Sequence, residues 1–296
     1  NLAGKTFEVQ TSDGERWIAA DVCEARSAAV SQAENLLETG RYAAVQVISD
    51  SERAGTEVVF EQENEHWIGN KEINIAGITE AAMCPRLSDY YDFPARRTVG
   101  RLMRQYLDEY GLSALELAFD ASHLKLLENN EKLFPRAVQR VAGLQAKETE
   151  TDQVQRADEI FSAITQVREH AGDTTAADEF AGVIKTQGLD AVIDRVGLSV
   201  PRQGREVAVR FGLARYLKDA ADWNGKLELL ARLGDGDLSD PSRRHLDEAM
   251  AERLMRLFEE LNRQGTTLLI ATHDTSLPRR FLHPVLRLDQ GELGHE

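Results

Sequence analysis

The chain has 296 residues, enough for two domains or one large one, and 42% of them are hydrophobic and 29% charged. Its net charge of −15 repels phosphate backbones, so nucleic-acid binding is not expected. No apolar run reaches the roughly 18 residues of a membrane-spanning helix, and the first residues lack a signal pattern. Two cysteines are too few for a disulfide framework or a zinc cage. We therefore expect a cytoplasmic protein with no direct membrane insertion.

Residues 1–75 predict a small acidic α+β domain, with fourteen Asp or Glu against six Lys or Arg. Two strand-like runs, "KTFEVQT" and "RWIAADV", flank Ser12-Asp13-Gly14, and Asp-Gly is a strong hairpin-turn signal. A helix is expected over "EARSAAVSQAENLLETG", ending at Gly40, before two more alternating runs, "AAVQVIS" and "TEVVFEQ". The order ββαββ predicts one antiparallel sheet with a helix across one face.

Residues 76–95 have a linker-like pattern, because glycine and proline interrupt any periodicity there. Within them, the stretch "MCPRLSDYYDFP" predicts a strap whose aromatic side chains dock on a neighbouring element. Residues 96–239 predict an irregular helical domain, since short amphipathic runs end repeatedly at glycines. The first of these runs, "RRTVGRLMRQYLDEYG", predicts a helix that stops at Gly111.

Two local features of this helical region are specific. Ser113 and Glu116 have the spacing of a capping box and predict the start of a short helix. Arg97, Arg101 and Arg104 form a basic stripe on one helix. Such a stripe more often pairs with the chain's own acids than binds a ligand, and the acidic N-terminal unit is the obvious internal mate.

Residues 240–296 predict a short α/β tail. Asp240-Pro241 is a good helix start, and the following residues carry an apolar stripe at helical spacing. A nearly continuous apolar strand, "TTLLIAT", comes next, and a closing pair of strands, "PVLRLDQGEL", has Gly291 in its turn. The expected fold class is therefore α+β and mostly helical, with a small antiparallel unit, a helical middle and this tail.

The stretch "LDEAMAERLMRLFEELNRQGTTLLIATHDTSLPRRFLHPVLRLDQGEL" closely resembles the C-terminal end of bacterial ATP-binding cassette (ABC) ATPases, most of all the cell-division FtsE type. The resemblance covers about a sixth of the chain and leaves residues 1–240 unassigned. It implies that His273 corresponds to the switch histidine that reaches the γ-phosphate of ATP. It also implies that Asp247 corresponds to the aspartate of the family's D-loop, so that both residues belong to a nucleotide site.

The upstream residues that such an ATPase needs do not match. The family places an Asp-Glu pair before the D-loop, and here Asp240 falls at the magnesium position while Pro241 replaces the catalytic glutamate. The phosphate-binding pattern G-x-x-x-x-G-K-[ST] occurs nowhere, and the family's signature loop is also missing. The short run "AGKT" at residues 3–6 precedes a strand pattern, whereas a phosphate-binding loop precedes a helix.

These observations favour a non-catalytic cytoplasmic interaction or regulatory protein that carries a partial ABC-ATPase tail and needs no cofactor. We expect it to bind a protein partner or a second copy of itself. The alternative is an ATP-binding protein of the ABC transporter or FtsE type, incomplete or dependent on a partner, which uses ATP and magnesium beside a membrane transporter subunit.

Two questions about the tail stay open at this stage. The strand at residues 266–272 could pair with the closing hairpin, with the N-terminal sheet, or with another chain, because a lone strand leaves its backbone groups unpaired. The tail itself is either a natural part of the protein or the product of a gene fusion or frameshift.

Overall fold

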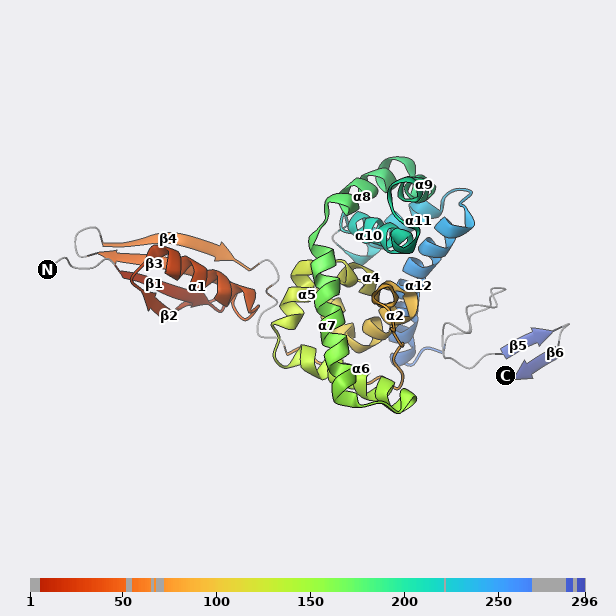
Figure 1. Cartoon of the computed structure of the whole chain (residues 1–296), viewed down its shortest axis with the longest axis horizontal. Helices are drawn as coiled ribbons and strands as arrows, with labels where there is room; N and C mark the ends of the chain where they lie inside the picture. The colour runs from red at the N-terminus through yellow and green to blue at the C-terminus, as the bar shows by residue number, and fades with distance from the viewer. Residues whose placement is uncertain are drawn as a thin grey trace.

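The computed structural model describes residues 6–51, 55–64, 67, 72–220, 222–267, 286–289 and 292–295. It confirms the predicted fold class, a mostly helical α+β protein with one small antiparallel sheet unit (Figure 1). The sheet unit lies at one end of the molecule and a larger body of helices follows it.

The predicted ββαββ order is present in the sheet unit. Strands β1 (Thr6–Ser12) and β2 (Trp17–Cys23) form a hairpin, and helix α1 (Arg26–Glu38) leads to β3 (Ala44–Ser51) and β4 (Gly55–Glu63). The strand order is β2-β1-β3-β4, and all three pairings are antiparallel. This arrangement leaves β2 and β4 as the two edges of the sheet.

Local signals explain the boundaries of these elements. Gly14 adopts φ +91° in the hairpin turn, where the Asp13 carboxylate accepts the backbone N–H of Arg16 at 3.1 Å. Gly40 follows α1 with φ +72°, a left-handed conformation that glycine adopts without strain. Helix α1 covers one face of the sheet, and their shared core consists of Phe7, Val9, Ala29, Ala33, Val45 and Val47.

The helical body is built from short elements in chain order. They are η1 (Leu87–Tyr91), α2 (Phe93–Leu102), α3 (Arg104–Glu109), α4 (Ala114–Ala118), α5 (Ala121–Glu128), α6 (Leu133–Thr149), α7 (Gln153–Gly172), α8 (Thr175–Gln187), α9 (Leu189–Ser199), η2 (Arg202–Gly204), α10 (Arg205–Leu217), α11 (Trp223–Gly234) and α12 (Asp240–Arg263). The run at residues 96–110 is divided at Met103, whose backbone leaves the helical region. Ser113 and Glu116 form the predicted capping box at the start of α4.

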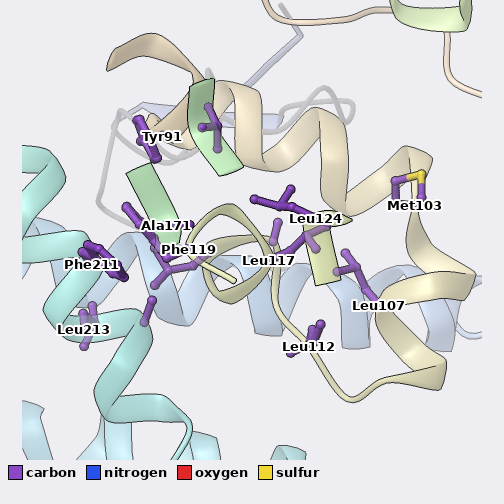
Figure 2. Packing of buried hydrophobic residues seen from close by; sticks show 14 of the residues in the cluster. Tyr91, Met103, Leu107, Leu112, Leu117, Phe119, Leu124, Ala171, Phe211 and Leu213 are labelled. Carbon is purple, nitrogen blue, oxygen red and sulfur yellow. The ribbon is translucent and has the colours of Figure 1, made fainter. Parts of the chain in front are cut away.

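The body has one continuous hydrophobic core (Figure 2). Residues 76–95 contribute to it, because Ile78 and Tyr91 are each only 2% exposed. The Tyr91 ring stacks on Phe119, with 4.9 Å between centroids, and Phe119 stacks in turn on Phe211 at 4.7 Å. The predicted strap is thus held on the body through Tyr91.

Contacts at the end of α1 connect the sheet unit to the body. The Lys125 ammonium lies 2.7 Å from the Glu38 carboxylate, and the Asn129 amide donates to the Glu38 carbonyl at 2.8 Å. Arg41 lies 3.3 Å from Glu131. The four side chains of these two ion pairs are 45–82% exposed, so the pairs contribute little to stability.

The predicted basic stripe is not on one helix, because Arg97 and Arg101 lie in α2 and Arg104 begins α3. Arg97 and Arg101 both contact the Glu80 carboxylate, at 3.3 and 3.1 Å. Their partner therefore comes from the segment just before η1, whereas the acidic sheet unit was the mate expected from composition.

The last described residues form the predicted closing pair of strands. Strands β5 (Leu286–Asp289) and β6 (Glu292–His295) pair antiparallel. Most of the predicted strand at 266–272 lies outside the described residues, which stop at 267 and resume at 286. Within the described part of the chain, no helix is long and apolar enough to cross a membrane.

Candidate functional site

Helix α12 is where the helical body meets the segment that resembles an ABC ATPase. It begins at Asp240, directly after Ser239, whose hydroxyl accepts the Ser242 backbone N–H at 3.5 Å. The hydroxyls of both serines donate to the Asp190 carboxylate of α9, Ser242 at 2.6 Å. These hydrogen bonds hold the pKa of Asp190 below its usual value. The start of α12 is thereby fastened to α9.

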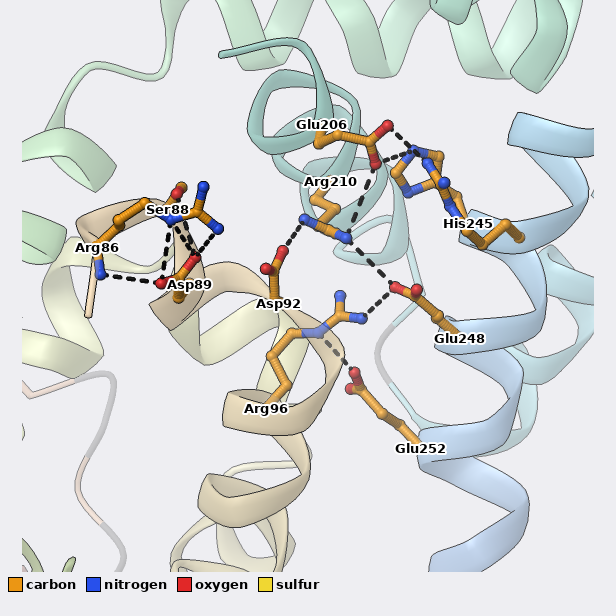
Figure 3. Close-up of polar contacts among 11 residues, drawn as sticks. Arg86, Ser88, Asp89, Asp92, Arg96, Glu206, Arg210, His245, Glu248 and Glu252 are labelled. Carbon is orange, nitrogen blue, oxygen red and sulfur yellow. Dashed lines mark hydrogen bonds and ion pairs between the residues drawn. The ribbon is translucent and has the colours of Figure 1, made fainter. Parts of the chain in front are cut away.

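A chain of charged side chains then joins α12 to α2 and α10 (Figure 3). The Arg96 guanidinium of α2 lies 2.9 Å from the carboxylate oxygens of both Glu248 and Glu252, one turn apart on α12. Arg210 of α10 lies 3.6 Å from Glu248 and 2.7 Å from Asp92. We call Asp92, Arg96, Arg210, Glu248 and Glu252 the ionic cluster.

The centre of the ionic cluster is closed to solvent. The side chains of Arg96, Glu248 and Glu252 are 2%, 9% and 8% exposed. Burial raises the pKa of Glu252, while the positive charge of Arg96 acts in the opposite direction. Charges buried in this way depend on one another, because removing one leaves its partner without water or counter-charge.

A second buried pair lies beside α12, between α11 and α4. The Lys226 ammonium of α11 is 2.6 Å from the Glu116 carboxylate of α4, and both side chains are almost fully buried. The Arg253 guanidinium of α12 lies over the Trp223 ring, and its burial lowers its pKa to about 10. These charged groups line a cavity of about 10 Å³, at the lower limit for a single water molecule. The cavity is too small for a nucleotide.

His245 is buried next to the ionic cluster. Its Nε2 lies 3.3 Å from a Glu206 carboxylate oxygen. Burial lowers its pKa from 6.5 to about 3, assisted by the nearby charges of Arg210, Arg244 and Arg96. His245 is therefore neutral near pH 7, and its contact with Glu206 is not an ion pair.

This depressed pKa predicts a pH dependence of stability. In the unfolded chain His245 takes up a proton below about pH 6.5, whereas the folded protein resists it until about pH 3. The stability that neutral His245 contributes is thus present above pH 6.5 and is lost as the pH falls through that window. Between pH 7 and about pH 5 the loss should be about 2 kcal/mol. Urea unfolding at both pH values should show this extra loss in the wild type and not in His245→Gln, and equal losses would contradict it.

Two leucines in the later part of α12 are exposed. Leu246 and Ala249 are 4% exposed and belong to the core, but Leu254 and Leu257 are 37% and 50% exposed. These two leucines continue the apolar stripe of the helix beyond the residues that cover it. The part of α12 up to Arg253 is therefore built into the body, and Leu254 and Leu257 beyond it are exposed to solvent.

The residues predicted from the ATPase resemblance are separated from this buried site. Asp240 and Asp247 both lie in α12 and are exposed to solvent. His273 lies outside the described residues. Among the residues that the structure describes, no group of three histidine, cysteine or acidic side chains could hold a metal ion. Asp240, Asp247 and His273 thus remain predictions from the resemblance.

Comparison with known proteins supports a relationship for part of the chain. The cell division ATP-binding protein FtsE of Escherichia coli K12 is 46% identical over 63 residues, which cover 20% of this chain and 28% of FtsE. FtsE of Haemophilus influenzae is 45% identical over 56 residues, 19% of this chain and 26% of that protein. The energy-coupling factor transporter ATP-binding protein EcfA of Methanococcus maripaludis is 42% identical over 48 residues, which cover 16% of this chain and 17% of EcfA.

No protein-family model matches this chain, and no solved structure matches it. The chain spans little more than a quarter of the length of the FtsE proteins, so their activity cannot be transferred to it as a whole. What these matches establish is that the chain contains a short segment related to ABC-type ATPases.

Proposed function

We propose that this chain is a non-catalytic interaction or regulatory protein that presents an ABC-ATPase-like tail to a protein partner or to a second copy of itself. The observation that carries the proposal is the division of α12. Arg96 fixes the helix in the body through Glu248 and Glu252, and Leu254 and Leu257, further along the helix, are exposed. A helix held rigidly at one end with an apolar edge at the other is suited to docking.

The sequence supports a role without catalysis. Pro241 stands where the related ATPases have the glutamate that polarises water, and a proline side chain cannot accept a proton. No G-x-x-x-x-G-K-[ST] run is present to supply the amides and the lysine that hold a triphosphate. Without that lysine and those amides, the negative charge of bound ATP would stay uncompensated.

The charge of the chain supports the choice of partner. A net charge of −15 disfavours nucleic acids and anionic lipid surfaces, and favours a protein as the binding partner. The cytoplasm is the compartment that we propose, because its reducing conditions suit two free cysteines, Cys23 and Cys84.

The alternative function is supported by the relatives themselves. FtsE and EcfA are named as ATP-binding proteins, of cell division and of a transporter. If this chain shares that property, it would bind ATP and magnesium through Asp240, Asp247 and His273, with the missing phosphate-binding loop supplied by another chain.

Titration of the purified protein with a magnesium complex of a non-hydrolysable ATP analogue, followed by calorimetry, separates the two functions. We expect no saturable heat into the millimolar range, because the charge of the triphosphate is uncompensated. His273→Ala should then behave like the wild type. Binding in the micromolar range that His273→Ala abolishes, and that the exposed control Leu198→Ala leaves intact, would replace our proposal by the alternative.

A further inference from the structure

The face of the sheet opposite α1 carries an unusual set of side chains. Strand register places Val22, Glu8, Ile48 and Val58 in one row across the four strands, because Glu8 pairs with both Val22 and Ile48, and Ile48 pairs with Val58. The next row contains Ala19, Gln10, Gln46 and Glu61. A hydrogen bond of 2.6 Å from Gln10 to Glu8 connects the two rows, and one of 2.6 Å from Gln46 to Gln10 lies within the second row.

This face is exposed along its two edge strands, whereas Gln46 at its centre is 8% exposed, and we call it the open face. Val22 and Val58 are 61% and 49% exposed, and Trp17, at the start of β2, is 39% exposed. Among the described residues, α1 is the helix that lies along the sheet, on the opposite side (Figure 1). Apolar side chains in a row at this degree of exposure are a feature of interaction surfaces rather than of a solvated sheet face.

The charge of the four strands has a single sign. Their sequences hold six carboxylates and no lysine or arginine. Glu8 and Glu61 lie on the open face. Asp21 is the acidic residue of the edge strand β2. A segment that covers the apolar row therefore enters a negative field within about one Debye length, roughly 10 Å at 0.1 M salt. A second copy of this acidic unit would be repelled, and a basic segment would be attracted.

The two edges of the sheet differ in how they resist pairing. Strand β4 carries Glu57, Glu61 and Glu63, and rows of charges discourage a further strand. Strand β2, "WIAADVC", has one charge in seven residues and no proline or lysine, and its first six residues are exposed. Its outward-facing backbone groups are therefore the ones accessible to a pairing strand.

We propose that β2 and the adjoining open face bind an extended segment of another protein, in which apolar and basic side chains alternate, as a fifth strand of the sheet. Backbone hydrogen bonds to β2 would supply affinity. Apolar side chains of the segment would then lie next to Trp17 and Val22 on the open face, and its basic side chains would point to the other face, near Asp21. The proposal concerns a surface far along the chain from α12, so nucleotide binding by the tail would leave it standing.

The test uses the full chain and two synthetic peptides, one of alternating lysine and valine and one of alternating glutamate and valine. We expect saturable calorimetric binding of the lysine peptide only, with perturbed amide NMR signals in β2 and weaker binding at higher salt. Val22→Lys, which puts a like charge on the edge, should weaken binding at least about tenfold. Leu198→Lys, a matched change at a residue that is 88% exposed on α9, should bind as the wild type does.

Three outcomes would overturn the proposal. Equal binding of the glutamate peptide would remove the role of charge, and unchanged binding by Val22→Lys would move the site away from β2. If neither peptide binds, and the chain self-associates in a way that Val22→Lys abolishes, the β2 edge binds a second copy of the chain instead. Because Val22 is exposed, loss of folding in the variant is not expected, and circular dichroism checks this directly.

Discussion

Replacement of Arg96 by alanine is expected to lower the free energy of unfolding by about 3–5 kcal/mol, the usual effect of breaking a buried ion pair from one side. Glu248 and Glu252 would both lose the guanidinium that lies 2.9 Å away, and solvent cannot replace it because the site is closed. Burial already raises the pKa of Glu252, so we expect this carboxyl to take up a proton in the variant. Urea unfolding at pH 7 measures the change.

The adjacent arginine provides the control. Arg97 pairs with Glu80 at the surface, and Arg97→Ala should change the free energy of unfolding by no more than about 1 kcal/mol. A third protein, with Arg96→Met, Glu248→Leu and Glu252→Leu together, should regain much of the lost stability, because apolar groups of similar size often replace buried charges well. Similar effects for Arg96→Ala and Arg97→Ala would show that the ionic cluster does not hold α12.

Ending the chain after Ser239 is expected to unfold the helical body, a loss of more than about 5 kcal/mol, comparable to the whole stability of a typical domain. The truncation removes Leu246 and Ala249 from the core and strips Arg96 and Arg210 of their partners on α12. Circular dichroism should show a reduced helical signal and no cooperative thermal transition.

Ending the chain after Arg263 is the matched comparison, because it keeps all of α12. This protein should retain the helical signal and the transition temperature of the full chain. The pair of truncations also bears on the origin of the tail. A body that stays folded without α12 would indicate that the ABC-like segment was joined to an independent protein, whereas collapse on losing α12 would indicate that the helix belongs to the fold of the body.

Features determined by nearby residues were predictable from the sequence. Gly14 and Gly40 marked the ends of a strand and a helix because their positive φ values are costly for other residues. Ser113 and Glu116 marked the start of α4 because a capping box needs only three residues of separation. The ββαββ unit followed from such signals together with alternating apolar residues.

The ionic cluster could not be predicted in this way. Arg96 meets Glu248 across 152 positions of sequence, and helical periodicity assigns an arginine to the solvated face by default. Arg97 and Arg101, which the pattern did single out, pair with Glu80 at the surface instead. One usable signal was present: Glu248 and Glu252 are one turn apart within a stretch that also carries the apolar stripe, so they lie beside its buried edge.

The ABC-like tail shows how much can be predicted from a resemblance that covers only a short segment. It predicted the final helix and the closing pair of strands, and comparison with FtsE and EcfA supports a partial relationship. The roles of Asp240, Asp247 and His273 depend on a nucleotide site contributed by the rest of such an ATPase, which this segment does not include. For that reason those roles stay predictions.

The contact between Arg96 and α12 has a consequence for the history of the gene. The arginine belongs to the body and its two carboxylates belong to the final helix, so a substitution on one side becomes tolerable only with a compensating change on the other. Among homologous sequences, positions 96, 248 and 252 should therefore vary together, and recombination with a breakpoint between residues 96 and 248 should be selected against unless both parents carry the same charges.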